Sequence, residues 1–213
     1  MPAPEGAPER APRVGIFGGT FDPPHVGHQA AVRAVQGALA LDRLLLMVAN
    51  DPWQKSPTRP ITPAEDRLAM TEALAATIPG AVASRLEIDR GGPTYSIETV
   101  KAVLAEESEP GPPGQPGPEI FLVVGADLVP ELDTWEKASE LAQLVTLAVV
   151  SRPSTPRPAA PAGWDVRWVD GPQVDVSSSG VREILARGGS VDGLVPEAVL
   201  QCMARRALYA VGR

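Results

Sequence analysis

Apolar and polar positions along the chain fall into two kinds of segment. Short apolar runs that end in glycine or polar residues predict β-strands at 13–18, 43–49, 81–88, 119–125, 144–150 and 164–169. Apolar residues at helical spacing predict helices at 28–39, 96–104, 134–142, 179–187 and 196–208, and one that Thr62 caps and Pro79-Gly80 ends. Because helices separate strands that are apolar on both faces, the pattern predicts an α/β fold with a parallel sheet covered by helices on both sides.

Two proline-rich stretches interrupt this pattern. They cover 106–118 and 152–163, where the density of proline excludes both a helix and a central strand. We interpret both as surface loops rather than linkers between domains. Residues 1–12 are also rich in proline and are predicted to be a disordered lead, which leaves a single domain over 13–213.

Composition narrows the class of protein. Hydrophobic residues make up 44% of the 213-residue chain, which excludes wholesale disorder, and the formal net charge of -7 gives no general basic surface for nucleic acid or a membrane. No apolar run reaches the ~18 residues of a membrane span. The single cysteine, Cys202, cannot form an internal disulfide, so a cytoplasmic location is expected and Cys202 is interpreted as a small apolar residue of the last helix. A homo-oligomer is left open.

The segment at 15–28 carries the first candidate chemistry. It reads GIFGGTFDPPHVGH, so that a predicted strand runs into Gly18-Gly19 and then into a helix that begins near the second of two histidines. Adjacent glycines let backbone N–H groups approach an anion, and the amino end of a helix favours negative charge. His25 and His28 are the only histidines of the chain, and imidazoles can donate hydrogen bonds to phosphoryl oxygens. Zinc is disfavoured, because Asp22 and Cys202 are the only further ligands in view.

These residues resemble a known family. The run GGTFDPPHVGH is similar to the HxGH motif of the nucleotidyltransferase superfamily, in the form found in bacterial nicotinate-nucleotide adenylyltransferases. The resemblance implies a Rossmann-like, doubly wound parallel sheet. It also implies that His25 and His28 contact the triphosphate of ATP during catalysis. Around them, the ATP-binding residues would be Gly18, Gly19, Thr20 and Phe21.

A second motif lies near the end of the chain. Residues 176–182 read VSSSGVR, which places three serines and an arginine at the start of a predicted helix. Alone, this pattern is a helix cap with a surface arginine. Beside the first motif it resembles the superfamily's ISSTxIR motif, with a serine in place of the threonine. The resemblance implies that Ser177, Ser178 and Ser179 bind ATP and that Arg182 neutralises its phosphates.

The middle of the chain is similar to the same family. Residues 50–67 read NDPWQKSPTRPITPAEDR, in which Lys55 matches a family residue that reaches the phosphates. Asn50-Asp51 departs from the pattern, because relatives often carry a Thr-Gly-type sequence there, near the acceptor. Residues 90–99 read RGGPTYSIET, and the resemblance implies that Thr94 and Tyr95 hold the carboxylate of the acceptor's pyridine ring.

Three further residues complete the expected acceptor site. Asp127 follows the most strand-like run of the chain, where it is placed to bind sugar hydroxyls. The resemblance implies that Trp135 stacks on the nicotinate ring and that Arg152 lies near the substrate. A tryptophan covering the core and a surface arginine are the alternatives from the residues alone.

The resemblance as a whole implies adenylyl transfer from ATP to nicotinate mononucleotide, which gives deamido-NAD and pyrophosphate in NAD biosynthesis. Mg²⁺ is expected as the cofactor, bound mainly through the ATP phosphates and without a dedicated protein metal site. The alternatives are a related nucleotidyltransferase with another phosphorylated acceptor, such as nicotinamide mononucleotide or phosphopantetheine, and a non-catalytic nucleotide-binding protein.

Overall fold

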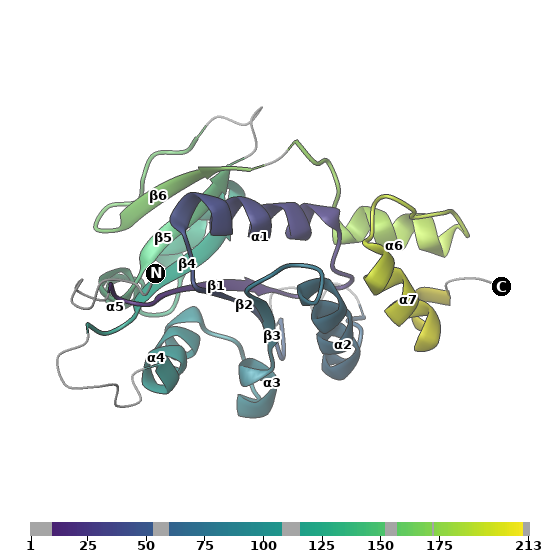
Figure 1. Ribbon diagram of the computed structural model, residues 1–213, viewed down its shortest axis with the longest axis horizontal. Coiled ribbons are helices and arrows are strands. Elements are labelled where there is room, and N and C mark those ends of the chain that lie inside the picture. Colours follow the sequence, from purple (N-terminus) through teal and green to yellow (C-terminus); the bar gives the residue numbers. More distant parts are fainter. Residues whose placement is uncertain (1–9, 53–59, 108–115, 152–156, 172, 211–213) are drawn as a thin grey trace, which may run out of the picture.

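A six-stranded parallel sheet forms the centre of the molecule (Figure 1). The computed structural model describes residues 10–52, 60–107, 116–151, 157–171 and 173–210. The strands are β1 (Arg13–Gly19), β2 (Arg43–Val48), β3 (Ala81–Ser84), β4 (Glu119–Gly125), β5 (Thr146–Ser151) and β6 (Asp165–Asp170). Their order, β3-β2-β1-β4-β5-β6, reverses direction between β1 and β4. The predicted Rossmann-like, doubly wound α/β fold is therefore confirmed.

Helices cover both faces of this sheet. They are α1 (Val26–Leu39), α2 (Ala64–Ala75), α3 (Leu86–Arg90), α4 (Ser96–Glu107), α5 (Ala138–Leu144), α6 (Ser178–Ala186) and α7 (Glu197–Arg205), with 3-10 turns η1 (Ala126–Thr134) and η2 (Leu208–Ala210). Figure 1 shows α1 over one face of the sheet and α4 over the other, with α6 and α7 at the end where β1 enters α1. None of the helices in the described residues is long and apolar enough to cross a bilayer.

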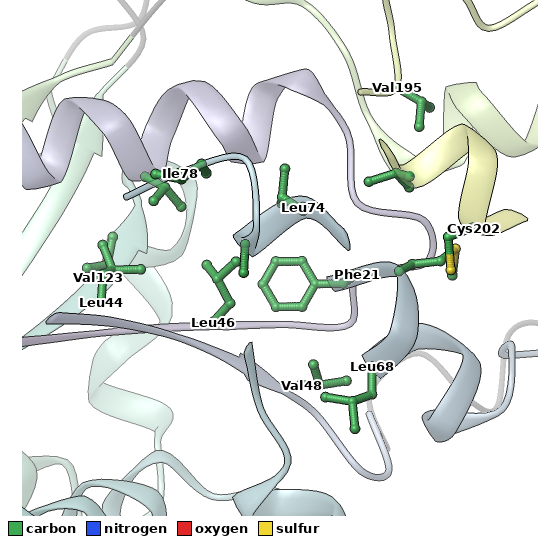
Figure 2. Packing of buried hydrophobic residues seen from close by; sticks show 14 of the residues in the cluster. Phe21, Leu44, Leu46, Val48, Leu68, Leu74, Ile78, Val123, Val195 and Cys202 are labelled. Carbon is green, nitrogen blue, oxygen red and sulfur yellow. The ribbon is translucent and has the colours of Figure 1, made fainter. Parts of the chain in front are cut away.

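The side chains of β2 show how the core is divided. Leu44, Leu46 and Val48 belong to a buried cluster that includes residues of α1, α2, α6 and α7. Leu45 and Met47 belong to a second cluster with residues of α4, η1 and α5. Because successive residues of a strand point to opposite faces, an uninterrupted apolar strand contributes to both clusters. Figure 2 shows part of the first cluster, in which the Phe21 ring lies beside Leu46 and Leu74.

The predicted strand at 81–88 is wrong in its second half. β3 pairs with β2 only from Ala81 to Ser84, and the chain then turns into the short helix α3. Arg85 and Asp89 form an ion pair across one helical turn, with Nε 2.9 Å from Oδ1. Since β3 lies at the edge of the sheet, nothing on its outer side extends the pairing.

Two helix boundaries also differ from expectation. The predicted helix at 134–142 is two elements, because η1 ends at Thr134 and α5 begins at Ala138. Thr62 does not cap α2, whose N-cap is Pro63. The Thr62 hydroxyl instead donates a hydrogen bond to the Tyr209 hydroxyl, at 3.2 Å between oxygens. The Thr62 side chain, which the local sequence predicts to be a helix cap, therefore hydrogen-bonds a residue 147 positions later in the sequence.

The expected disordered lead at 1–12 is wrong for its last residues. Arg10 forms an ion pair with Asp42, at 2.6 Å, and the Pro12 carbonyl accepts a hydrogen bond from the Glu119 N–H. Residues 10–12 are thereby attached to β2 and β4 at the amino end of the sheet. The expected loop at 106–118 begins later, since α4 continues to Glu107, and the described part of the loop at 152–163 contains neither helix nor strand.

Candidate active site

Two cavities meet at the carboxyl ends of β1 and β4, where the strand order reverses. The first has a volume of about 950 Å³ and the second about 660 Å³. Residues 17–20 of the β1 end line both cavities, as do Gly125 and Leu128 after β4. In open α/β sheets this switch point is where ligands bind. A molecule in one cavity therefore shares a wall with a molecule in the other.

The first cavity brings both sequence motifs together. The predicted residues that line it are Gly18, Gly19, Thr20, Phe21, His25, His28, Ser177, Ser178, Ser179 and Arg182. The two histidine rings lie side by side, with centroids 3.7 Å apart. Residues more than 150 positions apart thus surround one space, as an anion-binding site built from two helix starts requires.

A hydrogen bond to the His28 ring indicates which of its nitrogens carries the proton. His25 is the N-cap of α1, and its backbone N–H donates to Nδ1 of His28, at 3.1 Å. An imidazole nitrogen that accepts a hydrogen bond carries no proton, so the proton of this neutral ring is on Nε2. In this geometry His28 donates hydrogen bonds through Nε2.

Gly27 separates the two histidines in a confined space. A Cβ atom added at Gly27 would lie 3.0 Å from Nδ1 of His25 and 3.1 Å from Cγ1 of Val176. Such distances are shorter than ordinary carbon contacts, so a side chain here would displace the His25 ring. His25 is only 8% exposed, which leaves its ring little room to move. A residue larger than glycine here would therefore require the His25 ring or Val176 to shift by a few tenths of an ångström.

The serine–arginine motif holds the loop of the first motif. Ser177 is the N-cap of α6, and its hydroxyl accepts a hydrogen bond from the Gly180 N–H at 3.1 Å. Ser178 donates to the Pro23 carbonyl at 2.9 Å, and Nη1 of Arg182 donates to the Asp22 carbonyl at 2.7 Å. The amino end of α6 and the Arg182 guanidinium bring positive charge to the first cavity.

Phe21 and Asp127 both line the first cavity, but in different ways. The Phe21 side chain is 1% exposed and belongs to the core cluster, so its backbone rather than its ring is available to a ligand. Asp127, expected with the acceptor, lines the first cavity and not the second. A Cβ at Gly125 would meet the Asp127 carboxylate, so a larger residue here would require the Asp127 side chain to move. The turn of η1 decides this placement, and the sequence pattern did not reveal it.

The second cavity contains three of the expected acceptor residues. Thr94, Tyr95 and Trp135 line it, and Tyr95 is 38% exposed at its surface. Glu87, which the sequence pattern placed in a strand, also lines it and is only 4% exposed. Its Oε1 accepts a short hydrogen bond from the Thr99 hydroxyl. Burial raises the pKa of the Glu87 carboxyl, and hydrogen bonds from Thr99 and Thr94 offset part of that effect.

Asn50 and Asp51, which depart from the family's sequence pattern, lie at the second cavity. Nδ2 of Asn50 donates to the Gly92 carbonyl at 3.1 Å, and Asp51 forms an isolated parallel bridge with Pro93. Asp51 also lines the cavity. The two residues therefore connect the end of β2 to the loop that carries Thr94.

Three polar residues, Asp22, Arg67 and Tyr209, lie in or against the loop between β1 and α1. The sequence motifs did not assign them to the site. Arg67 is 1% exposed, and Asp22 is equally buried. The Tyr209 hydroxyl donates to Oδ1 of Asp22, and burial followed by this hydrogen bond raises the pKa of Tyr209. One signal could have revealed Arg67. It lies on the same face of α2 as Met70 and Leu74, and a charge on an apolar helix face predicts a buried partner network.

Two predicted residues, Lys55 and Arg152, lie outside the described residues. Within the described part of the chain, no group of three or more His, Cys, Asp or Glu side chains is arranged to hold a metal ion.

Comparison with known proteins decides the family. The cytidylyltransferase-like family model matches residues 16–184. A probable nicotinate-nucleotide adenylyltransferase of Corynebacterium kroppenstedtii is 38% identical over 201 residues, which cover 93% of this chain and 91% of that protein. The chain belongs to the nicotinate-nucleotide adenylyltransferase family. A probable member from Thermus thermophilus is also 38% identical, over 92% of this chain and 99% of its own length.

A solved structure of this family shows the same fold. The nicotinic acid mononucleotide adenylyltransferase of Plasmodium falciparum, complexed with NaAD, has a TM-score of 0.74 and 13% identity. The match covers 94% of this chain and 98% of that one. At this identity the likeness concerns the fold alone. The family and the nucleotidyltransferase class predicted from the two motifs are confirmed by the sequence relatives.

Proposed function

We propose that this protein transfers the adenylyl group of ATP to nicotinate mononucleotide, with deamido-NAD and pyrophosphate as products, as a step of NAD biosynthesis. The observation that carries the proposal is the pair of cavities that share the wall at residues 17–20. One is surrounded by groups suited to polyphosphate and the other is flanked by Tyr95 and Trp135. The relatives' names support the same reaction.

The chemistry needs no general base from the protein. The 5′-phosphate of the acceptor is already an anion, and its oxygen attacks the α-phosphorus of ATP. A new P–O bond forms as the bond from the α-phosphorus to the bridging oxygen breaks, and pyrophosphate leaves with that electron pair. The site's contribution is positioning and charge neutralisation.

On the nucleotide side, the residues of the first cavity divide this work. Backbone N–H groups at Gly18, Gly19 and Thr20 approach the phosphates. His25 and the Nε2–H of His28 donate to the phosphoryl oxygens as charge moves onto the leaving pyrophosphate. Arg182 supplies a fixed positive charge beside them. Ser177, Ser178 and Ser179 bring the amino end of α6 to the same anion.

On the acceptor side, Thr94, Tyr95 and Trp135 would hold the pyridine base in the second cavity. An aromatic face suits an electron-poor pyridinium ring. Asp127 is placed to accept hydrogen bonds from sugar hydroxyls, on the nucleotide side of the shared wall. The roles of Lys55 at the phosphates and Arg152 near the substrate stay predictions.

Mg²⁺ fits this site as a substrate-borne ion. The described residues contain no ready-made set of metal ligands, while ATP supplies phosphate oxygens of the kind that Mg²⁺ prefers. When bound, the ion would neutralise charge on the pyrophosphate group. We propose the cytosol as the compartment, because Cys202 has no partner for an internal disulfide.

One observation supports a second candidate for the acceptor substrate. The described lining of the second cavity includes the carboxyl groups of Asp51, Glu87, Glu131 and Glu136 and no lysine, arginine or histidine. This negative lining suits an acceptor without a carboxylate on its ring. Nicotinamide mononucleotide, which carries a neutral amide there, is therefore the second candidate.

The test is a pyrophosphate-release assay with ATP and Mg²⁺. Nicotinate mononucleotide, nicotinamide mononucleotide and phosphopantetheine are supplied in turn, and mass spectrometry identifies the product. We expect turnover with nicotinate mononucleotide to exceed that with the others, and a His25→Ala variant to be nearly inactive while it still binds the acceptor. Release with phosphopantetheine alone would assign another acceptor. ATP binding without release for any acceptor would support a non-catalytic protein.

A further inference from the structure

Arg67 lies behind the wall that the two cavities share. It comes from the first turns of α2, and its side chain is almost completely buried. Three of its nitrogens donate to four backbone carbonyls. Nε reaches Thr62 at 2.8 Å, Nη1 reaches Thr20 at 3.0 Å and Ala49 at 2.6 Å, and Nη2 reaches Asn50 at 2.9 Å.

These carbonyls belong to three segments that are distant in sequence. Thr20 follows β1 and lines both cavities, whereas Ala49 follows β2 and lines only the second. The Ala49 N–H also donates to the Gly19 carbonyl at 3.0 Å. A shift of the loop after β1 is therefore transmitted to the loop after β2 through the guanidinium as well as through the backbone.

Only an arginine side chain suits this position. The guanidinium is planar and offers five N–H donors in a fixed fork, so that it can fix several acceptors in one relative geometry. A lysine ammonium has three donors on a flexible stem and imposes no such plane. Because a buried guanidinium is costly to desolvate, these four carbonyl contacts help to hold it there.

We propose that Arg67 is a positioning residue that couples the two cavities, so that a nucleotide bound in the first increases the affinity of the second for the acceptor. The proposal rests on the proposed function for the identity of the two ligands. Neither ligand is expected to touch Arg67. The residue acts through the backbone of Thr20, which lines both cavities, and of Ala49, which lines the second.

A neighbouring contact provides a matched control. Tyr209 bridges the Thr62 hydroxyl and the Asp22 carboxylate, so it belongs to the same buried region without contacting the Ala49–Asn50 segment. A Tyr209→Phe variant removes polar contacts from this region but leaves the four Arg67 hydrogen bonds in place. Loss of stability alone should therefore appear in both variants, whereas loss of coupling should appear only when Arg67 is changed.

The first experiment measures coupling by calorimetry. The Kd of α,β-methylene-ATP, which cannot transfer its adenylyl group, is measured with and without saturating nicotinate mononucleotide. In the wild-type protein we expect the acceptor to lower this Kd about fivefold or more, within the usual range of coupling between sites. In Arg67→Lys the ratio should fall to about one, and in Tyr209→Phe it should stay at the wild-type value. A wild-type ratio of one, or an unchanged ratio in Arg67→Lys, would overturn the proposal.

The second experiment needs neither a variant nor the acceptor. Amide hydrogen exchange of the wild-type protein is followed with and without α,β-methylene-ATP. Nucleotide in the first cavity should slow exchange at Ala49 and Asn50, which do not line that cavity. Unaltered exchange there, with protection confined to residues 18–28 and 177–182, would contradict the coupling even if Arg67→Lys does not fold. If nicotinate mononucleotide fails to bind at all, the proposed function fails, and this measurement still decides whether the loop after β1 is coupled to the loop after β2.

Discussion

At the scale of single residues, Gly27 lies in close contact with His25, the side chain that we propose to be catalytic. It occupies the second position of α1, where its missing Cβ leaves room for the His25 ring on one side and Val176 on the other. Glycine weakens a helix relative to alanine, so the conformational cost is accepted for the packing that it permits. Gly37, farther along the same helix, has open space around it.

We expect Gly27→Ala to reduce kcat/KM by about 10-fold to 100-fold, because the added methyl group displaces the His25 ring from the first cavity. The matched control is Gly37→Ala, which should stabilise α1 by about 0.5–1 kcal/mol and leave kcat unchanged. Steady-state kinetics and thermal unfolding of the two variants provide the measurement. Equal kcat/KM values for both variants would show that His25 does not depend on Gly27.

Glu87 allows a prediction of pH dependence. Burial raises the pKa of its carboxyl above the ordinary value of 4.5, so the folded protein holds this proton more tightly than the unfolded chain. The resulting stability is complete at pH values below the unfolded pKa and is lost as the pH rises through the folded pKa. A Glu87→Gln variant cannot undergo this loss. We expect the Tm of the wild-type protein, relative to that of Glu87→Gln, to fall as the pH rises above the ordinary value of 4.5 and through the raised pKa of the folded protein. A constant difference would contradict the raised pKa.

Among the elements, α1 and α6 build the first cavity from their starts. The His25 cap of α1 and the Ser177 cap of α6 lie on the same space, and Ser178 of α6 hydrogen-bonds the loop that precedes α1. The two helix starts therefore support one another as well as a ligand. Binding and local stability are linked here, since the N–H groups that a phosphate would use are also those that capping residues serve.

A Ser177→Ala variant tests this link at the level of the element. Without the hydroxyl, the Gly180 N–H loses its acceptor, and we expect a loss of about 1 kcal/mol of stability. In a chain of this size that lowers Tm by about 2–4 °C. Ser178→Ala keeps the cap but loses the bond to Pro23, so its main effect should be a raised KM for ATP. Thermal unfolding and kinetics together distinguish the two, and equal Tm values for Ser177→Ala and the wild-type protein would contradict the cap.

At the scale of the whole molecule, one sheet separates two apolar clusters, and both cavities lie at its carboxyl edge. Alternate residues of β2 enter opposite clusters, so loss of packing on either face weakens the same strand. Leu141 of α5 is fully buried in the second cluster and lines neither cavity. It can therefore report on the stability of the fold without direct contact with the site.

We expect Leu141→Ala to destabilise the protein by about 2–5 kcal/mol through lost burial and the cavity left behind. Because Leu141 is remote from both cavities, kcat measured well below the unfolding midpoint should equal that of the wild-type protein. Gln143→Ala, an exposed change on the same helix, should alter stability by less than about 0.5 kcal/mol. Chemical denaturation measures both, and a lowered kcat in Leu141→Ala at low temperature would show that the face carrying α5 also supports catalysis.

Prediction from sequence succeeded where the signal is local. The apolar strands and both phosphate-type loops are encoded within short windows, and the boundaries of β1 and β4 agree to within one residue. It failed at 85–88, where the length of a strand depends on its neighbours in the sheet. The role of Asp127 in binding sugar hydroxyls stays a prediction. Lys55 and Arg152 remain predictions, since they lie outside the described residues.

The sequence by itself determined the order of strands and helices, the presence of a phosphate-type loop and the family, because each depends on residues that are close together in the chain. Only the tertiary structure decided that Arg67 joins the loops after β1 and β2, that Glu87 enters the second cavity, and that Arg182 reaches the Asp22 carbonyl. Those contacts arise between segments that meet only when the sheet is assembled. A polar side chain can in principle hydrogen-bond many different backbone groups. Packing of the folded chain brings one set of these groups within hydrogen-bond distance.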